Sequence, residues 1–335
     1  MRSVWACTKC RKKYFFSMQR LILFRKLPNS FHKALCKWPN SNTINISRAR
    51  KQHDAYINLV TKPTLYPFNY TKTSWIVLPE NELYPDCCFV EDCAVSLMPN
   101  VLLLTNPVES SRNGEKTTHN IFWRNFASTS PQIKIEEMED DEHCDGGDLL
   151  RIGCNLFVGV GGRTTTRGFE RLKDICDDYS LKIVPVHVGK SALHLKSLVT
   201  WLGTDIGFVA ANNEDGKNAL GTILQKTTFR QRFNFMDCAI AANMLRIENT
   251  VIHHPKANIE NLQKENPKID FLSCDMSELN KADGALTCCS VFFEYTNAKR
   301  RFFAKQLKPQ HSRLFTAKNP QGNFPLQIYA ANCVF

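Results

Sequence analysis

Acidic residues are absent from both ends of this 335-residue chain. Residues 1–53 contain 13 lysines and arginines but no aspartate or glutamate, and residues 295–335 contain seven and again no acid. Residues 54–294 carry all 32 acidic residues against 23 basic ones, so the net charge of +11 resides in the ends. A protein that binds a nucleic-acid backbone needs clustered positive charge. The acidic body argues against a nucleic-acid partner and is compatible with a cationic small-molecule substrate.

Long hydrophobic runs are absent as well. Near the start, the longest apolar run is Leu21 to Phe24, which is too short for the hydrophobic region of a secretory signal or for a membrane span. We therefore expect a cytoplasmic protein that has no membrane partner and keeps its 14 cysteines as free thiols. The acid-free, arginine-containing start makes a mitochondrial location the alternative.

Complete signatures of nucleotide and zinc sites are also missing. Residues 189–191 end like a phosphate-binding loop, but Val184 stands where that loop needs a glycine. Residues 159–161 begin like a dinucleotide-binding loop, but Thr164 replaces its third glycine. The Cys-Thr-Lys-Cys sequence at residues 7–10 lacks the second pair of a zinc site. We expect neither a metal nor an organic cofactor.

A pattern that is present repeats along the body of the chain. Five short apolar runs, each typical of a buried strand, begin 35 to 55 residues apart: Val101–Leu104, Leu156–Val160, Ile206–Ala211, Val251–Ile252 and Leu286–Phe293. This spacing leaves room for one mixed βαβ unit around each run. An array of about five such units is predicted to close on itself rather than leave a free edge.

Two amphipathic helices are expected between these runs. Arg167–Tyr179 places Phe169, Leu172, Cys176 and Tyr179 on one face. Ser47–Val60 has Ser47 as its expected N-cap, and its inward face is expected to comprise Ala49, His53, Tyr56 and Val60.

Other segments show no period. Thr61–Ser74 and Asn113–Pro131 are therefore expected to be irregular. We expect a single domain at residues 27–297, with flexible basic extensions at residues 1–26 and 298–335. Solvated tails are the simplest interpretation of these extensions, and membrane-surface patches or nucleic-acid arms are the alternatives.

Three carboxylates, Asp86, Glu91 and Asp92, lie beside large apolar residues in the sequence PDCCFVED. Burying them is costly unless a cation compensates, although caps or salt bridges would also explain them. In a straight strand Asp86 and Asp92 would lie roughly 20 Å apart, at about 3.3 Å per residue. The segment must curl if both are to hold one cation.

Three further residues supply the parts of an activated nucleophile. Taken singly, Asp145 is an ordinary turn residue, His194 a core histidine, and Cys288 a small buried hydrophobe. Together they provide a thiol, an acid/base and a carboxylate to orient the histidine.

The phrases around these residues resemble those of the dimethylarginine dimethylaminohydrolases, a family of guanidino-modifying enzymes. Five phrases occur in the right order between Leu27 and Phe293: PDCCFVED, CDGGD, RTTTRG, LHLKS and ADGALTCCSV. The resemblance implies a five-bladed, pseudosymmetric α/β propeller (the pentein fold) with its active site at the centre. We expect a monomer or a weak homodimer.

The resemblance also assigns a role to each matching residue. Cys288 is the nucleophile, His194 the general acid/base, and Asp145 its carboxylate partner. The implied substrate contacts are Asp86, Glu91 and Asp92 around the guanidinium, Arg112 and Arg163 at the α-carboxylate, and the backbone of Leu35 and Ala282 at the amino group. The irregular stretch expected after Arg112 departs from the family pattern.

The implied reaction is hydrolysis of N-omega-methylated arginines to citrulline and methylamine or dimethylamine through a covalent thiouronium, which relieves inhibition of nitric oxide synthase. Alternatives are an arginine deiminase, a catalytically silent homologue, and a nucleic-acid or membrane binder with basic tails. Lys196 favours the methylarginine enzymes, because deiminases tend to carry an aspartate there. A silent homologue would lack one of the three catalytic residues, and all three are present.

Overall fold

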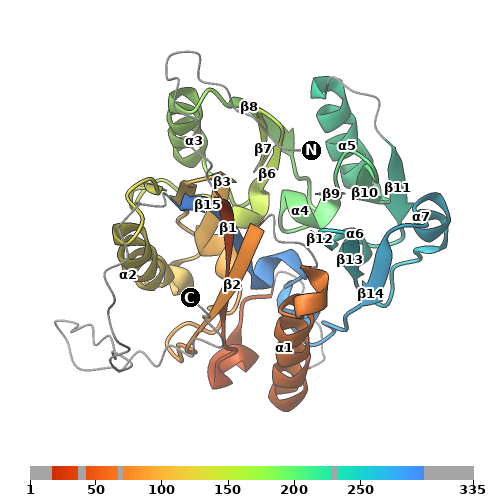
Figure 1. Cartoon of the computed structure of the whole chain (residues 1–335), viewed down its shortest axis with the longest axis horizontal. Helices are drawn as coiled ribbons and strands as arrows, with labels where there is room; N and C mark the ends of the chain where they lie inside the picture. Colours follow the sequence, from red (N-terminus) through yellow and green to blue (C-terminus); the bar gives the residue numbers. More distant parts are fainter. Residues whose placement is uncertain (1–16, 37–42, 67–70, 228–231, 298–335) are drawn as a thin grey trace, which may run out of the picture.

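Five three-stranded sheets surround one centre in the computed structural model, which describes residues 17–36, 43–66, 71–227 and 232–297 (Figure 1). In each sheet the middle strand pairs antiparallel with one neighbour and parallel with the other. A helix on the outside of the ring connects the middle strand to its parallel neighbour. The predicted five-bladed α/β propeller is confirmed.

The elements are as follows. The sheets, each with its middle strand second, are β15 (Val291–Asn297), β1 (Ser17–Arg25) and β2 (Thr71–Leu78); β3 (Ala94–Met98), β4 (Val101–Leu104) and β5 (Lys134–Glu137); β6 (Leu149–Ile152), β7 (Asn155–Val160) and β8 (Lys182–His187); β9 (Val199–Trp201), β10 (Phe208–Ala211) and β11 (Phe233–Met236); β12 (Leu245–Ile247), β13 (Thr250–His253) and β14 (Asp270–Ser273). The connecting helices are α1 (Ile46–Val60), α2 (Glu115–Ser128), α3 (Thr166–Asp178), α5 (Glu214–Lys226) and α7 (Glu260–Glu265), and the shorter helices are α4 (Leu195–Leu198) and α6 (Ala239–Ala242).

Four of the five predicted runs form middle strands. β4, β10 and β13 are buried along their whole length, because helices cover one face and the ring interior covers the other. The fifth run, Leu286–Phe293, was predicted as one strand and is not. Its first half forms a 3-10 turn at Thr287–Cys289, and β15 begins only at Val291.

Both predicted helices are confirmed, with small shifts at their starts. α1 buries the predicted face, Ala49, His53, Tyr56 and Val60. Its N-cap is Asn45 rather than Ser47, because the Asn45 side chain accepts the backbone N–H of Arg48. α3 begins after Thr165, whose hydroxyl caps the N–H of Gly168.

The segment Asn113–Pro131, predicted as irregular, contains the 14-residue helix α2. Its buried face comprises Glu115, His119 and Trp123 at four-residue spacing. Two of these residues are polar, and Gly114 precedes the helix without a capping side chain. The usual sequence signals of an amphipathic helix were therefore weak. The other segment predicted as irregular, Thr61–Ser74, contains the start of β2.

The domain begins earlier than the predicted boundary at Leu27. β1 pairs antiparallel with β15 and parallel with β2, and its residues Leu21–Phe24 are at most 2% exposed. The segment resembled a basic tail because it carries Arg20 and Arg25. In the structure Arg20 is neutralised by two glutamates, Glu248 and Glu294. The rest of the predicted extensions, residues 1–16 and 298–335, lies outside the described residues.

Removing β1 is expected to unfold the protein. A chain shortened to residues 27–297 would lose four buried side chains worth roughly 6 to 12 kcal/mol and would leave β2 and β15 unpaired. That loss is comparable to the whole stability of a domain, about 5 to 15 kcal/mol. Urea unfolding followed by circular dichroism checks this, with a chain of residues 17–297 as the matched control. Equal transition midpoints for the two chains would contradict the new boundary.

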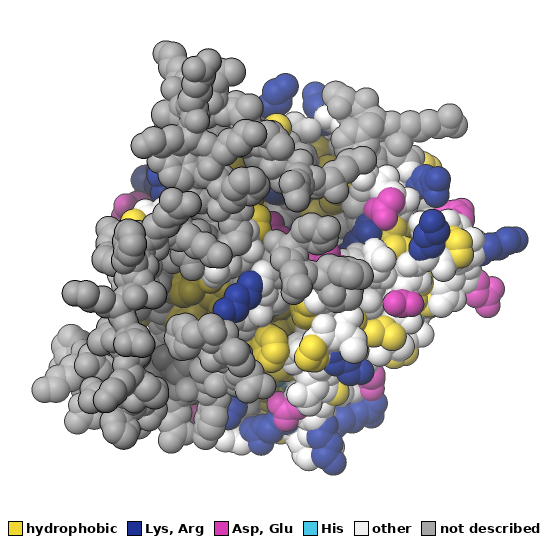
Figure 2. All heavy atoms as spheres, viewed as in Figure 1, with side chains coloured by type: hydrophobic (Ala, Val, Ile, Leu, Met, Phe, Trp, Pro, Cys, Tyr) yellow, Lys and Arg dark blue, Asp and Glu magenta, His cyan; other side chains and the backbone are white. Residues whose placement is uncertain are grey.

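Charges of both signs share the described surface. On the face drawn in Figure 2, lysine and arginine side chains alternate with aspartate and glutamate across the described residues, without forming one continuous basic patch. No described helix combines the length and apolar character needed to cross a membrane.

Candidate active site

Loops from several blades meet at a small cavity in the centre of the ring. Its walls comprise Leu35, Asp86, Phe89, Asp92, Arg112, Asp145, Arg163, Leu193, His194, Ala282, Asp283, Gly284 and Cys288. Nine of the ten predicted site residues are among them, and Glu91 is the exception. The structure therefore gathers residues that lie as much as 253 positions apart in the chain, Leu35 and Cys288.

The predicted curl after β2 is present. The N–H of Phe89 donates to the carbonyl of Asp86 at 2.9 Å, and the N–H of Asp92 donates to that of Phe89 at 3.2 Å. These tight turns bring both aspartates to one cavity, while Phe89 packs on Phe31. Burial, the dominant influence, raises the pKa of Asp86 to about 6 although Arg112 lowers it. The Leu35 N–H donates to the same carboxylate at 3.1 Å.

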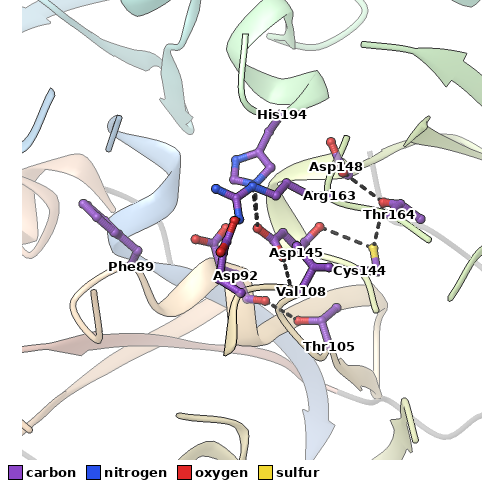
Figure 3. Close-up of polar contacts among 12 residues, drawn as sticks. Phe89, Asp92, Thr105, Val108, Cys144, Asp145, Asp148, Arg163, Thr164 and His194 are labelled. Atoms are coloured by element: carbon purple, nitrogen blue, oxygen red, sulfur yellow. Dashed lines mark hydrogen bonds and ion pairs between the residues drawn. The ribbon is translucent and has the colours of Figure 1, made fainter. Parts of the chain in front are cut away.

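His194 and Asp145 form a buried pair. Nε2 of His194 lies 2.9 Å from Oδ2 of Asp145, and the two residues are 3% and 2% exposed (Figure 3). The N–H of Val108 holds the other oxygen of Asp145 at 3.3 Å. Gly147 is required beside them, because a Cβ there would lie 2.6 Å from Nδ1 of His194.

Charge makes His194 a proton donor near neutral pH. Burial lowers its pKa, but the negative charge of Asp92 and the hydrogen bond to Asp145 outweigh burial and set the pKa at about 9.

Asp148, a residue of the CDGGD phrase with no predicted role, fixes the loop that carries His194. Its carboxylate accepts the N–H of Leu195 at 3.0 Å and the hydroxyl of Thr164 at 2.9 Å (Figure 3).

The two adjacent cysteines occupy different environments. Cys288 lines the cavity and is 8% exposed, whereas Cys289 is fully buried in an apolar cluster. In the strand predicted for Leu286–Phe293, alternation would have separated the two side chains, but this part of the segment is not a strand. The pair lies in a 3-10 turn, in which successive side chains diverge by about a third of a turn. Burial, followed by the charges of Asp92 and Glu91, raises the pKa of the Cys288 thiol far above its usual range.

Arg112 lines the cavity but already binds two carboxylates. Its Nη1 donates to Oδ2 of Asp92 at 2.7 Å, and its Nε and Nη2 donate to the two oxygens of Glu115 at 3.1 and 2.7 Å. Burial raises the pKa of Asp92, but Arg112 and His194 together outweigh burial and hold this pKa below its usual range. Glu115 was missed in the sequence because α2 was not predicted. In this structure the guanidinium of Arg112 organises Asp92, a contact that the predicted α-carboxylate role did not include.

Arg163 is less constrained. It forms an ion pair with Glu109, whose side chain is 41% exposed, and its Nε lies 3.9 Å from Oδ2 of Asp145. A partly exposed partner screened by water contributes little. Of the two arginines that line the cavity, Arg163 is therefore the one that can more easily exchange its present carboxylate partner for that of a substrate.

Glu91 faces away from this cavity. Its Oε1 accepts Nζ of Lys196 at 2.6 Å, and both residues line a separate cavity of about 400 Å³. Nζ of Lys196 also donates to the carbonyl of Gly146 at 3.2 Å. In this structure Glu91 is therefore not placed to make the predicted contact with a guanidinium in the central cavity.

Metal-ligand atoms of Asp92, Asp145 and His194 lie within 4.8 Å of one another. Asp92 already binds Arg112, and Asp145 binds His194. A divalent cation would have to displace both contacts, so the donor set is better matched to holding the histidine than to holding an ion.

The chain is similar to dimethylarginine dimethylaminohydrolases, as the sequence phrases predicted. No protein-family model matches it. It is 26% identical over 253 residues to the N(G),N(G)-dimethylarginine dimethylaminohydrolase of Pseudomonas aeruginosa, which covers 74% of this chain and 89% of that protein. It is 39% identical over 127 residues to the Streptomyces coelicolor protein of that name, covering 37% of this chain and 46% of that one.

A solved structure has the same fold. It is DDAH from Pseudomonas aeruginosa, a cysteine-to-serine mutant complexed with citrulline. It superposes with a TM-score of 0.66 at 23% identity, over 84% of this chain and all of that one. The pentein fold is therefore shared.

Proposed function

We propose that this protein hydrolyses N-omega-methylated arginines to citrulline and methylamine or dimethylamine. The observation that carries the proposal is the meeting of Cys288, paired His194 and Asp145, and the carboxylate of Asp86 in one central cavity. Such a set holds a guanidinium beside a thiol and a proton donor. Similarity to dimethylarginine dimethylaminohydrolases over 74% of the chain supports the same reaction.

In the proposed reaction, the cationic substrate favours ionisation of the Cys288 thiol, whose pKa burial raises, and the thiol proton passes to solvent. The thiolate adds to the central guanidinium carbon. Protonated His194 then donates its proton to the departing nitrogen, so that the amine leaves and a thiouronium remains on Cys288. Neutral His194 next takes a proton from water, and the hydroxide adds to the same carbon. The C–S bond then breaks, which regenerates the Cys288 thiolate and releases citrulline as its new oxygen loses a proton to solvent. Asp145 holds His194 in orientation throughout.

Incubating the full chain with asymmetric dimethylarginine and measuring citrulline tests the proposal. Free arginine in a parallel reaction distinguishes a deiminase. Lys196 stands where deiminases tend to carry an aspartate, so this position offers no carboxylate to an unsubstituted guanidinium nitrogen, which supports methylarginine as the preferred substrate. Citrulline from arginine but not from dimethylarginine would replace this proposal by the deiminase, and citrulline from neither would refute both.

Arg163 is expected to select substrates that carry an α-carboxylate. Agmatine has the guanidinium without the carboxylate, and one lost charge-assisted hydrogen bond costs about 1.5 to 3 kcal/mol, or roughly 10- to 150-fold in kcat/KM. Because Arg112 is held by Asp92 and Glu115, we expect the contribution of one arginine rather than two. Arg163→Ala should raise KM for dimethylarginine and change kcat/KM for agmatine little.

The comparison needs both compounds in both proteins, with Arg167→Ala as a matched control on an exposed ion pair with Asp141. Similar wild-type kcat/KM values for agmatine and dimethylarginine would contradict the role of Arg163.

A further inference from the structure

Cys288 and His194 belong to different loops, and their separation must be fixed by residues outside the cavity. Cys288 lies in the turn before β15, and His194 immediately precedes α4. Between these loops lies Asn243, which follows α6 and is 1% exposed. Asn243 is absent from the cavity wall, so any influence on the reaction must act through its neighbours.

The side chain of Asn243 makes three hydrogen bonds that join the two loops. Nδ2 donates to the carbonyl of Lys196 at 3.0 Å and to the hydroxyl of Thr287 at 3.0 Å. Oδ1 accepts the backbone N–H of Thr287 at 3.1 Å. Both N–H groups of the amide and its oxygen are thus used.

Each end of this bridge lies next to a catalytic side chain. Thr287 directly precedes Cys288, and Lys196 follows His194 by two residues. Lys196 also donates to the carbonyl of Gly146, which adjoins Asp145. One buried amide therefore connects the segments that carry all three residues of the proposed catalytic set.

We propose that Asn243 is a positioning residue that holds the Cys288 turn at a fixed distance from the His194 loop. This inference rests on the proposed function for its turnover measurements. A buried amide with every hydrogen-bonding atom used is rigid and costly to replace, and a displacement of about 1 Å between reacting groups lowers a rate on the order of 100-fold.

Asn243→Ala removes all three bonds, and Asn243→Asp keeps an acceptor for the Thr287 N–H but no donor for the Lys196 carbonyl. Both are expected to lower kcat about 10- to 100-fold with KM within about threefold, because the hydrogen bonds of Asn243 described above run to Lys196 and Thr287 and not to the substrate contacts Asp86 and Arg163. Thr287→Val, which loses the hydroxyl, should lower kcat, whereas Thr287→Ser should keep most of it.

Asn266→Ala is the matched control. Asn266, which directly follows α7, is also buried, and its Nδ2 donates to the carbonyl of Leu262, away from the cavity wall. Both alanine variants are expected to lower the thermal midpoint. Only the Asn243 variant should lose kcat at a temperature at which both remain folded.

Alkylation of Cys288 by iodoacetamide, followed by mass spectrometry of its peptide, provides a readout that needs no turnover. A loosened turn admits water to a thiol whose pKa burial raises, so Asn243→Ala should react about 10-fold faster than wild type at pH 7. The Asn266 variant should react at the wild-type rate.

Unchanged kcat and an unchanged alkylation rate in Asn243→Ala would overturn the inference, as would equal changes in the Asn266 variant. If wild type releases no citrulline, the proposed function fails, while the alkylation rates still decide the role of Asn243.

Discussion

Replacing Cys288 with serine is expected to abolish citrulline release, by at least about 10⁴-fold in kcat, whereas Cys289→Ser should leave most of it. A serine hydroxyl is a far weaker nucleophile than a thiolate, and only Cys288 lines the cavity. Cys289 packs in an apolar cluster and its Sγ contacts the carbonyl of Ala285 at 3.6 Å. A buried cysteine of this kind contributes packing rather than chemistry.

Citrulline release and circular dichroism on the two serine variants check this expectation. A covalent adduct trapped with substrate and identified on the Cys288 peptide would give independent support. Equal losses of turnover in two well-folded variants would mean that the nucleophile has been misassigned.

Asp145→Asn is expected to lower kcat by about 10³- to 10⁴-fold while preserving the fold, because replacing the carboxylate that orients a catalytic histidine has effects of this size. The substitution keeps the side-chain shape but removes the negative charge 2.9 Å from Nε2 of His194. His194 would then lose both its orientation and part of the interaction that raises its pKa.

The same variant has a signature in the pH dependence of stability. The folded-state pKa of His194, about 9, lies above the unfolded value near 6.5. Its protonation therefore stabilises the folded protein fully below about pH 6.5, and this contribution, up to about 3 kcal/mol, is lost as the pH rises through 9.

Asp145→Asn should make that loss smaller. Urea unfolding of wild type and variant at pH 6 and pH 9 measures the difference, with Glu142→Gln, on the neighbouring turn, as a control. An identical pH dependence in wild type and Asp145→Asn would show that Asp145 does not set the protonation of His194.

Local patterns in the sequence were sufficient to predict the ring of five blades. Middle strands such as β4 and β10 are continuous apolar runs because both of their faces are covered, and burial of that kind is visible in composition. β1 was not recognised because Arg20 and Arg25 made it resemble a tail. The glutamates that neutralise Arg20 lie more than 200 positions away, a pairing that no local pattern contains.

In the site, too, some features could be predicted from local sequence and others depend on contacts made only in the folded chain. Its chemical groups were predictable because a thiol, an imidazole and a carboxylate are distinctive residue types, and known phrases surround them. The residues that hold those groups were not predictable. Asp148 and Asn243 act through hydrogen bonds to partners from other segments. Glu115 pairs with Arg112 three residues earlier, a contact that depends on the unpredicted start of α2. The engagement of Arg112 by Asp92 likewise depends on the curl before η3 (Val90–Cys93) and on α2.

The antiparallel pairing of β1 with β15 also determines how the ring responds to a mechanical load. Ser17 lies opposite Asn297, and the pairing runs inward from there to Leu23 and Val291. A force that separates residues 17 and 297 acts across the strands, so the hydrogen bonds break in succession from the outer end, because they run perpendicular to the strands. The other four sheets are each formed from consecutive strands and bear no tension until this pair has opened. The seam between the first and last strands is therefore the point at which the ring yields.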